Sequence, residues 1–389
     1  AQFVENQGIG AVCTYQAEDF SAKIDYLLQH HRSIQYQSFK LGQKLSADGV
    51  AQWIWDSLAQ GQAMDARFEA QQKPAKVTDA SVVITPNEVT YRHGTGALIK
   101  RVFPNDAQII SVRSDNHYGG EHSFGLESYY LPQRGWSRKQ VFTNIAHIFA
   151  DHEVSRIFCV PYYSEDVLTA IAIKELFGVP LGIWIMDDQN VAVNNIPDAL
   201  MEEFLQKADV RFATHPVLRD GYESKFGLKC WILPAVVPHG LIKTDVFQPL
   251  EENCQQQRGA LLGSIWSQQW FSDLCHSVKE AGVQLDWYGN SKYYWLTESD
   301  EDLQAKGIYP QGLFPEDKLV EKLKEYPFVV VPTGTMDERD DQPQLSQLSL
   351  PGRIQFALAT SNTPVILMGS EKTSAASFIK RFQIGVVCD

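Results

Sequence analysis

The stretch RIFCVPYYSEDVLTAIAIKELFGVPLGIWIM, residues 156–186, contains a complete strand–helix–strand unit. It opens and closes on mostly apolar runs that have the length of buried strands. Between these runs, Ser164 and Asp166 are typical of the first turn of a helix, while Gly178 and Pro180 are typical of a helix end. Helices that alternate with such strands indicate a parallel sheet covered on both faces.

The same alternation extends in both directions from this unit. Before residue 243, further strands are predicted at 81–85, 107–112, 210–214 and 230–234, and helices at 93–103, 197–207 and 216–226. Beyond residue 257, strands are predicted at 258–265, 283–288, 328–332 and 365–367, and helices at 270–281, at 315–325 and within 349–361. The predicted fold class is therefore α/β, with two Rossmann-like domains and a deep ligand-binding cleft between them.

The N-terminal residues differ from the rest because they carry helical signals and few strand signals. Apolar residues recur at helical spacing in two runs, which are Phe20, Ile24, Leu27 and Leu28, then Val50, Trp53, Ile54 and Leu58. Linkers are predicted at the Gln-rich stretch 71–76 and at the polar stretch 243–257. We therefore predict a helical extension at 1–75 and Rossmann-like domains at 76–245 and 246–389.

Composition narrows the classes of partner. The 389 residues include 34 Lys and Arg against 47 Asp and Glu, which gives a formal net charge of −13. This balance argues against nucleic-acid or anionic-membrane partners, because both need a basic face. The six cysteines are dispersed and form no C-x-x-C pair, so we expect reduced thiols and a cytoplasmic location. No apolar run approaches the ~20 residues of a transmembrane helix.

The stretch SLPGRIQFALATSNTPVIL, residues 349–367, is the first candidate site because its helix carries one ionisable residue, Arg353. The first amides of a helix attract anions, and Gly352 would let a phosphate approach them closely. Arg353 would add a cationic fork. A plain capped helix with a solvent-facing arginine is the alternative. Further candidates follow predicted strands, where they either line the same site or only form turns, and are Gly263, Ser264, Gly289, Asn290, Thr333 and Gly334.

Two candidates lie in the first predicted α/β domain. Gly94, Thr95 and Gly96 form a turn at a helix start, where the backbone could approach a sugar or phosphate, while Lys100 and Arg101 on that helix are expected to be solvated. Asp187 and Asp188 follow a predicted strand. An acid there could orient a substrate hydroxyl or act as a base, or it could cap the next turn.

Other polar clusters are given structural interpretations. His117, Glu121 and His122 do not have the spacing of a zinc motif, so we predict no metal site. The acidic run DERDD at 337–341 is expected to be a solvated loop, and His215 and His239 are expected to be structural.

Four ordered segments resemble the retaining glycosyltransferases of the GT-B fold, in the group often called glycosyl transferases group 1 or family 4. They are HGTGALIKRVF at 93–103, the stretch 207–249, the strand 258–265 with WYGN at 287–290, and FVVVPTGT at 328–335 followed by PGRIQFALATSNTPVI at 351–366. The resemblance covers about residues 80–389. It implies an acceptor-side domain at 76–245 and a donor domain at 246–389, in a family whose members continue with further helices beyond this point.

The resemblance also implies a reaction. A nucleotide diphosphate sugar, such as a UDP-sugar, would be the co-substrate, and neither a metal nor another cofactor would be required. The sugar would pass with retention to a glycan or glycoconjugate acceptor in polysaccharide biosynthesis. Ser349 and either Gln355 or Ala357 stand where the family has two glutamates, so Ser349, Gly352, Arg353 and Gln355 become donor-binding candidates. Asp187, Asp188 and Arg353 are the catalytic candidates.

Two other functions remain open from the sequence. A GT-B-like sugar-nucleotide epimerase would need several carboxylates and a histidine in the cleft, and the C-terminal half supplies few. A non-catalytic GT-B-like binding or scaffold protein would account for the missing glutamates. In that case the N-terminal helices could serve as a partner or oligomer contact.

Overall fold

The computed structural model describes residues 4, 10–14, 16–45, 77–117, 119–120, 124–242, 258–289 and 295–388, with the side chains of 41–45 excepted. The second predicted helical run at 50–58, both predicted linkers, Glu121, His122 and Asn290 lie outside these residues.

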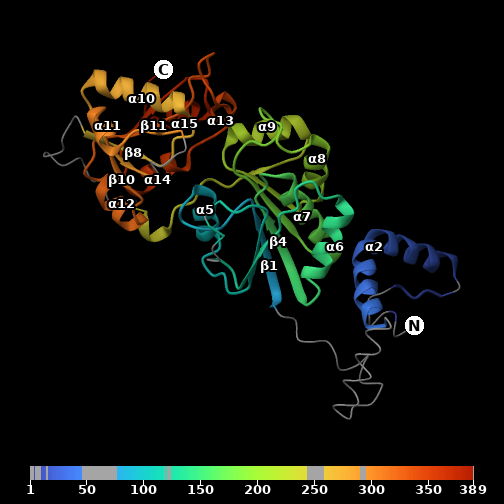
Figure 1. The fold of residues 1–389 in the computed structure, drawn as a ribbon. Helices are drawn as coiled ribbons and strands as arrows, with labels where there is room; N and C mark the ends of the chain where they lie inside the picture. Colours follow the sequence, from blue (N-terminus) through green and yellow to red (C-terminus); the bar gives the residue numbers. More distant parts are fainter. Residues whose placement is uncertain are drawn as a thin grey trace, which may run out of the picture. The chain divides into compact units, whose positions relative to one another are not determined.

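The strand pairs described in the first sheet are parallel, as the strand–helix alternation predicts (Figure 1). Its strand order is β3-β2-β1-β4-β5-β6-β7. The strands are β1 Val77–Thr85, β2 Ile109–Arg113, β3 Glu127–Tyr130, β4 His152–Cys159, β5 Leu181–Ile185, β6 Val210–Ala213 and β7 Trp231–Ile232. The accompanying helices are α5 Gly94–Val102, α6 Arg138–Ile148, α7 Ser164–Phe177, α8 Asp198–Lys207 and α9 Pro216–Phe226, followed by the short 3-10 helix η1 His239–Leu241.

Helix α7 is the central helix of this region. It packs against β1 and β4 and also against helices α2 (Ala17–Leu45), α6 and α8 (Figure 1). It ends at Gly178, whose φ of 65° lies in the left-handed region that glycine adopts without steric cost. Because α7 has neighbours on several sides, it buries the small residues Thr169, Ala170 and Ala172 as well as larger apolar ones such as Val167, Ile171 and Leu176.

The N-terminal extension contains the predicted helix at its first apolar run, since α2 spans Ala17–Leu45. Tyr36, which is buried, contributes to its contact with the α/β core, and Arg32 pairs with Glu175. The Tyr36 hydroxyl donates a hydrogen bond to the carbonyl oxygen of Phe149 at 2.9 Å, and its ring lies 5.0 Å from that of Phe177. The second half of α2 is therefore docked on α6 and α7.

The second sheet is also parallel, with the strand order β10-β9-β8-β11-β12-β13. Its strands are β8 Arg258–Leu262, β9 Gln284–Tyr288, β10 Ile308–Gly312, β11 Val329–Pro332, β12 Val365–Met368 and β13 Gly385–Cys388. Its helices are α10 Gln268–Ala281, α11 Asp300–Ala305, α12 Glu316–Leu323, α13 Pro343–Gln347, α14 Gly352–Thr360 and α15 Ser374–Phe382. Separate apolar clusters contain Leu262 and Ile354 on the one hand and Leu261 and Trp270 on the other.

The chain divides into two compact units. The first comprises Ala1–Glu88, Asn105–Trp184 and Ile196–Arg211, and the second comprises Val89–Pro104, Ile185–Asn195 and Phe212–Asp389. Helix α5 and residues 185–195, at and directly after the end of β5, therefore belong to the same unit as the whole second sheet. Every described candidate site residue named from the sequence falls within the second unit.

Among the described residues, no helix is both long enough and apolar enough to cross a membrane.

Candidate functional site

Helix α14 begins at Gly352, directly after Pro351, as the sequence predicts. Its first turn carries no acidic residue, and no side chain caps this end by a hydrogen bond within the described part of the chain. Gly352 is exposed. The start of α14 thus presents backbone amides and the positive end of the helix dipole without a carboxylate beside them.

Arg353 connects this helix start to the end of β8. Its Nη1 donates to the carbonyl oxygen of Leu262 at 2.6 Å and to that of Ser264 at 2.5 Å. Gly263 lies between these two carbonyls with a φ of +75°, and a Cβ atom there would lie 3.0 Å from Nη1 of Arg353. Arg353 therefore holds the turn after β8 in addition to any ligand contact.

Gly289, at the end of β9, packs directly on the same turn. A Cβ atom at Gly289 would lie 2.5 Å from the carbonyl oxygen of Gly263, so only glycine allows this approach. The same oxygen accepts a hydrogen bond from Nε1 of Trp287 at 2.8 Å. The structure thus brings together four candidates, and these are Gly263, Ser264, Gly289 and Arg353.

The residues before α14 lie beside the segment that follows β5. The Ser349 hydroxyl donates to Oδ1 of Asp187 at 3.4 Å. The preceding carbonyl, that of Leu348, accepts a hydrogen bond from Nε2 of His215 at 2.8 Å. Within α14, Gln355 Oε1 accepts from the amide of Ala235 at 3.2 Å. Asp187, Ser349 and Gln355 are therefore neighbours of the same helix start, and Ala235 is a neighbour that no sequence signal indicated.

Asp188 has a different environment from Asp187. Its carboxylate accepts hydrogen bonds from the amides of Asn190, Val191, Ala192 and Val193 at distances of 2.6–3.3 Å. This is the turn-capping role that the sequence left open as the alternative. Of the two acids, Asp187 is the one with a contact to the α14 region.

Thr333 and Gly334 are buried after β11. The Ser346 hydroxyl oxygen accepts the Gly334 amide at 2.7 Å and contacts the Thr333 hydroxyl at 3.1 Å. A Cβ atom at Gly334 would lie 2.1 Å from Oδ2 of Asp340. In the structure, these two residues pack inside the loop that follows β11.

The prediction that residues 337–341 form a solvated acidic loop is wrong for Asp340, which is 8% exposed. Its carboxylate accepts a hydrogen bond from Nε1 of Trp270 at 2.9 Å. It also accepts hydrogen bonds from the amides of Met336 and Gln342 at 2.9 and 3.0 Å. The Ser267 hydroxyl also donates to Asp341. The start of α10, after β8, and the loop after β11 are therefore tied to each other by what we call the Trp270–Asp340 brace.

Helix α5 begins at Gly94, as predicted, with His93 as its N-cap. Nδ1 of His93 accepts the Gly96 amide at 3.3 Å. The expectation that Arg101 is solvated is wrong, because its side chain is only 11% exposed. It pairs with Glu316 and donates from Nη1 to the carbonyl of Val236 at 2.7 Å. This arginine is committed to packing inside the second unit.

The two glycines of the α5 turn should respond differently to alanine. A methyl group at Gly96 would meet the Thr90 carbonyl oxygen at 2.4 Å and its amide nitrogen at 2.5 Å, whereas at Gly94 it would meet nothing within 4 Å. We expect Gly96→Ala to lower the free energy of unfolding by about 1–3 kcal/mol. Gly94→Ala should leave it unchanged or slightly raised. Urea unfolding measures both, and equal values for the two variants would contradict the packing argument.

His215 is a structural N-cap in the described fold, in agreement with the sequence. Its Nδ1 accepts the Leu218 amide at 3.4 Å while Nε2 donates to Leu348, so the ring is neutral. Burial lowers the pKa of His215 below its usual value. A proton on Nδ1 would remove the acceptor that caps α9.

Stability should consequently depend on the protonation of His215. A histidine whose folded pKa is lowered contributes stability that is present above the unfolded pKa of about 6.5 and is lost as the pH falls through the folded pKa. We expect the free energy of unfolding to decline below pH 6.5 more steeply in the wild type than in His215→Asn, which keeps a capping oxygen and does not titrate. Exposed His276→Asn is the matched control, and it should keep the wild-type profile. Identical profiles for all three proteins would exclude His215 as the cause.

Within the described residues, no group of three or more His, Cys, Asp or Glu side chains is arranged to hold a metal ion. Nε2 of His117 lies 3.4 Å from Oδ2 of Asp115.

Two parallel sheets with flanking helices, in this order along the chain, form the GT-B fold of glycosyltransferases. The lipopolysaccharide outer core galactosyltransferase WaaB in its apo form is similar, with a TM-score of 0.51 and 14% identity over 77% of this chain and 83% of that one. HepE of Anabaena in complex with UDP and glucose has a TM-score of 0.50 and 12% identity over 77% of this chain and 82% of its own. Identities this low show the fold alone. No protein-family model and no curated protein matches the sequence.

Proposed function

We propose that this protein is a glycosyltransferase that moves a sugar from a nucleotide diphosphate sugar, such as a UDP-sugar, to a hydroxyl of a glycan or glycoconjugate. The observation that carries the proposal is the start of α14, where Gly352 is exposed and no acid stands in the first turn. Arg353, Gly263 and Gly289 gather beside it. The GT-B fold adds support, since the similar structures include a galactosyltransferase and a protein bound to UDP and glucose.

In the proposed reaction, the bond between the anomeric carbon and the diphosphate oxygen breaks, and the acceptor oxygen bonds to that carbon. The acceptor oxygen attacks on the face from which the diphosphate leaves, which gives retention, and its proton passes to the departing phosphate, so the step needs no protein base or metal. The amides and dipole of α14 stabilise the charge that develops on the diphosphate. Asp187, held near Ser349, orients the acceptor hydroxyl, while Asp188 fixes the loop that carries it. The donor domain is proposed at 246–389, the acceptor-side domain at 76–245 and the helical extension at 1–75.

A substitution at Gly352 separates ligand binding from folding. The nearest atom to a Cβ at Gly352 is the Ala235 methyl at 3.4 Å, so a side chain fits. In Gly352→Asp, a carboxylate near the helix start should interact favourably with the positive end of the helix dipole but should repel a phosphate. We expect the wild type to bind UDP-glucose, another nucleotide sugar or UDP itself in calorimetric titration. Gly352→Asp should bind the same ligand at least tenfold more weakly, which is a loss of about 1.4 kcal/mol in binding free energy.

Gly352→Asn is the control, because it has nearly the same size without the charge, and it should bind more tightly than Gly352→Asp. The nucleotide panel comprises UDP-, GDP- and ADP-sugars, with release of the nucleotide as the assay of transfer. Absence of binding to every member would refute the proposal. Binding without transfer or donor hydrolysis would favour the non-catalytic alternative, and conversion of the bound sugar to its epimer would favour an epimerase.

A further inference from the structure

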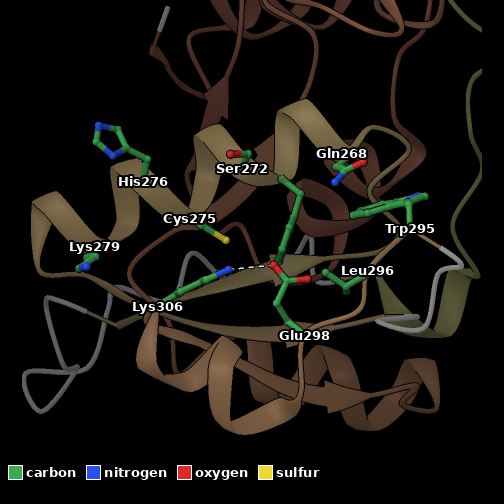
Figure 2. Close-up of a pocket in the computed structure, with 10 residues that line it drawn as sticks. Gln268, Ser272, Cys275, His276, Lys279, Trp295, Leu296, Glu298 and Lys306 are labelled. Atoms are coloured by element: carbon green, nitrogen blue, oxygen red, sulfur yellow. Dashed lines mark hydrogen bonds and ion pairs between the residues drawn. The ribbon is translucent and has the colours of Figure 1, made fainter.

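A cavity of about 310 Å³ lies beside α10 in the second unit, and it contains none of the site residues discussed above (Figure 2). Its volume falls at the lower end of the range of about 300–1,000 Å³ that is common for small-molecule sites. The residues that matter for its chemistry come from α10, from the segment before α11 and from the end of α11, and they are Phe271, Cys275, Trp295, Leu296, Glu298 and Lys306.

One wall of the cavity is apolar and is formed by two aromatic rings that are inclined to each other. The rings of Phe271 and Trp295 have centroids 6.0 Å apart and planes inclined at 55°, and Leu296 lies next to Trp295 in the chain and in the cavity (Figure 2). Phe271 is 3% exposed and anchors this wall in the core. A ring with an apolar face could therefore lie against Trp295 while its edge points elsewhere.

The cavity also holds an ion pair between Lys306 and Glu298, and His276 and Lys279 are further residues that line it. Nζ of Lys306 lies 2.8 Å from Oε1 of Glu298, and Figure 2 shows the two head groups meeting inside the cavity. Their hydrogen bond lowers the pKa of Glu298 and raises that of Lys306, so both stay charged near neutral pH. A phosphate would have to compete with Glu298 for Lys306, whereas a hydroxyl can donate to the carboxylate and accept from the ammonium together.

Cys275 does not add reactivity to the cavity. Its thiol points toward the Lys306–Glu298 pair in Figure 2, and its burial raises the pKa of the thiol to about 11. The thiolate is the nucleophilic form, and little of it exists near neutral pH. The cavity is therefore suited to reversible binding.

We propose that this cavity is a carbohydrate-binding site, in which one pyranose ring lies against Trp295 and its hydroxyls bond to Glu298 and Lys306. A pyranose combines an apolar ring face with hydroxyls at its edge, which matches an aromatic wall and the hydrogen-bonded Lys306–Glu298 pair in one cavity. The ligand is a neutral glycan, held on the donor-domain side at residues distinct from those around α14. This role deepens the proposed function, on which it rests, because it names a neutral glycan as the acceptor or product that the protein retains.

The test uses the full-length protein and linear hexasaccharides of glucose, galactose, mannose and N-acetylglucosamine, followed by saturation-transfer NMR and calorimetry. We expect at least one of these glycans to bind the wild type. Trp295→Ala should weaken that binding at least tenfold, and Trp295→Phe should restore part of it. Glu298→Gln, which keeps the shape but breaks the charged pair, should also weaken it. Trp231→Ala is the matched control, since Trp231 is 56% exposed and lies outside the cavity.

Two results would overturn the proposal. The first is that none of the four glycans binds the wild type, and the second is that the wild type, Trp295→Ala and Glu298→Gln bind a glycan equally well. Nucleotide-sugar binding is measured on the same proteins and should be unchanged by both substitutions. Loss of UDP-glucose affinity in folded Trp295→Ala would count against a separate site. Glycan binding by a protein that binds no nucleotide sugar would support the cavity while refuting the glycosyltransferase proposal, so the two failures are distinguishable.

Discussion

Replacing Arg353 by alanine should both destabilise the protein and weaken its nucleotide binding. The substitution removes the donor shared by the carbonyls of Leu262 and Ser264, and Leu262 is buried. Leaving buried carbonyls without a partner costs about 1–3 kcal/mol each, so we expect the free energy of unfolding to fall by about 2–4 kcal/mol. Loss of a charged hydrogen-bond donor near a diphosphate should weaken binding by about 1.5–3 kcal/mol, roughly 10- to 150-fold.

Arg353→Lys separates the two contributions. Lysine keeps the charge but lacks the planar group that reaches both carbonyls, so its stability should lie near that of Arg353→Ala while its nucleotide affinity recovers in part. Urea unfolding and calorimetry with UDP-glucose measure the two quantities on the same samples. If Arg353→Ala is destabilised but binds the nucleotide like the wild type, Arg353 is a structural clamp of the β8 turn and leaves the list of ligand-binding residues.

Replacing Asp340 by alanine should be comparably disruptive, although the residue sits in an acidic run. Its carboxylate satisfies the indole N–H of Trp270 and two loop amides, all of which would lose their acceptor. We expect a loss of about 3–4 kcal/mol in the free energy of unfolding, because water entering the space can satisfy only part of these donors. Asp340→Asn should be milder, since its amide oxygen still accepts.

Asp337→Ala is the matched control from the same run. Asp337 is exposed, and the hydrogen bonds from Arg339 and Thr335 hold the pKa of its carboxyl at about 2. Its partners lie two residues away in either direction, so its removal should change stability little. Thermal unfolding of the two variants side by side decides the matter. Similar behaviour of Asp337→Ala and Asp340→Ala would show that the Trp270–Asp340 brace contributes no stability.

The sequence predicted the α/β elements well where local signals agreed. Helix α9 matches its predicted limits, because His215 and Pro216 mark its start and Gly227 its end. Strand β10 was not predicted, since Pro310 interrupts its apolar pattern. The position of β10 at the edge of the second sheet explains why a proline is tolerated there, because an edge strand needs fewer amide donors. Helix α6 was also missed, although Ser137 and Gln140 form a capping box that could have indicated it.

The candidate site was predictable only in part. Turn residues that follow parallel strands gather at one edge of a sheet, and this rule brought Gly263 and Gly289 into one cluster. Neither Ala235 nor the burial of Asp340 could be inferred, because their partners lie 120 and 70 residues away in the chain. Such pairings arise from tertiary packing and leave no periodic pattern in the sequence.

The Trp270–Asp340 brace has a consequence for how related sequences can diverge. The indole N–H and the carboxylate satisfy each other inside the protein, so losing either one leaves the other buried without its partner. Mutational drift at the two positions should therefore be correlated, with homologues that lack the tryptophan also replacing the aspartate by an apolar or smaller residue. A family alignment would show this as covariation between columns 270 and 340, and independent variation of the two columns would argue that the loops can be connected in another way.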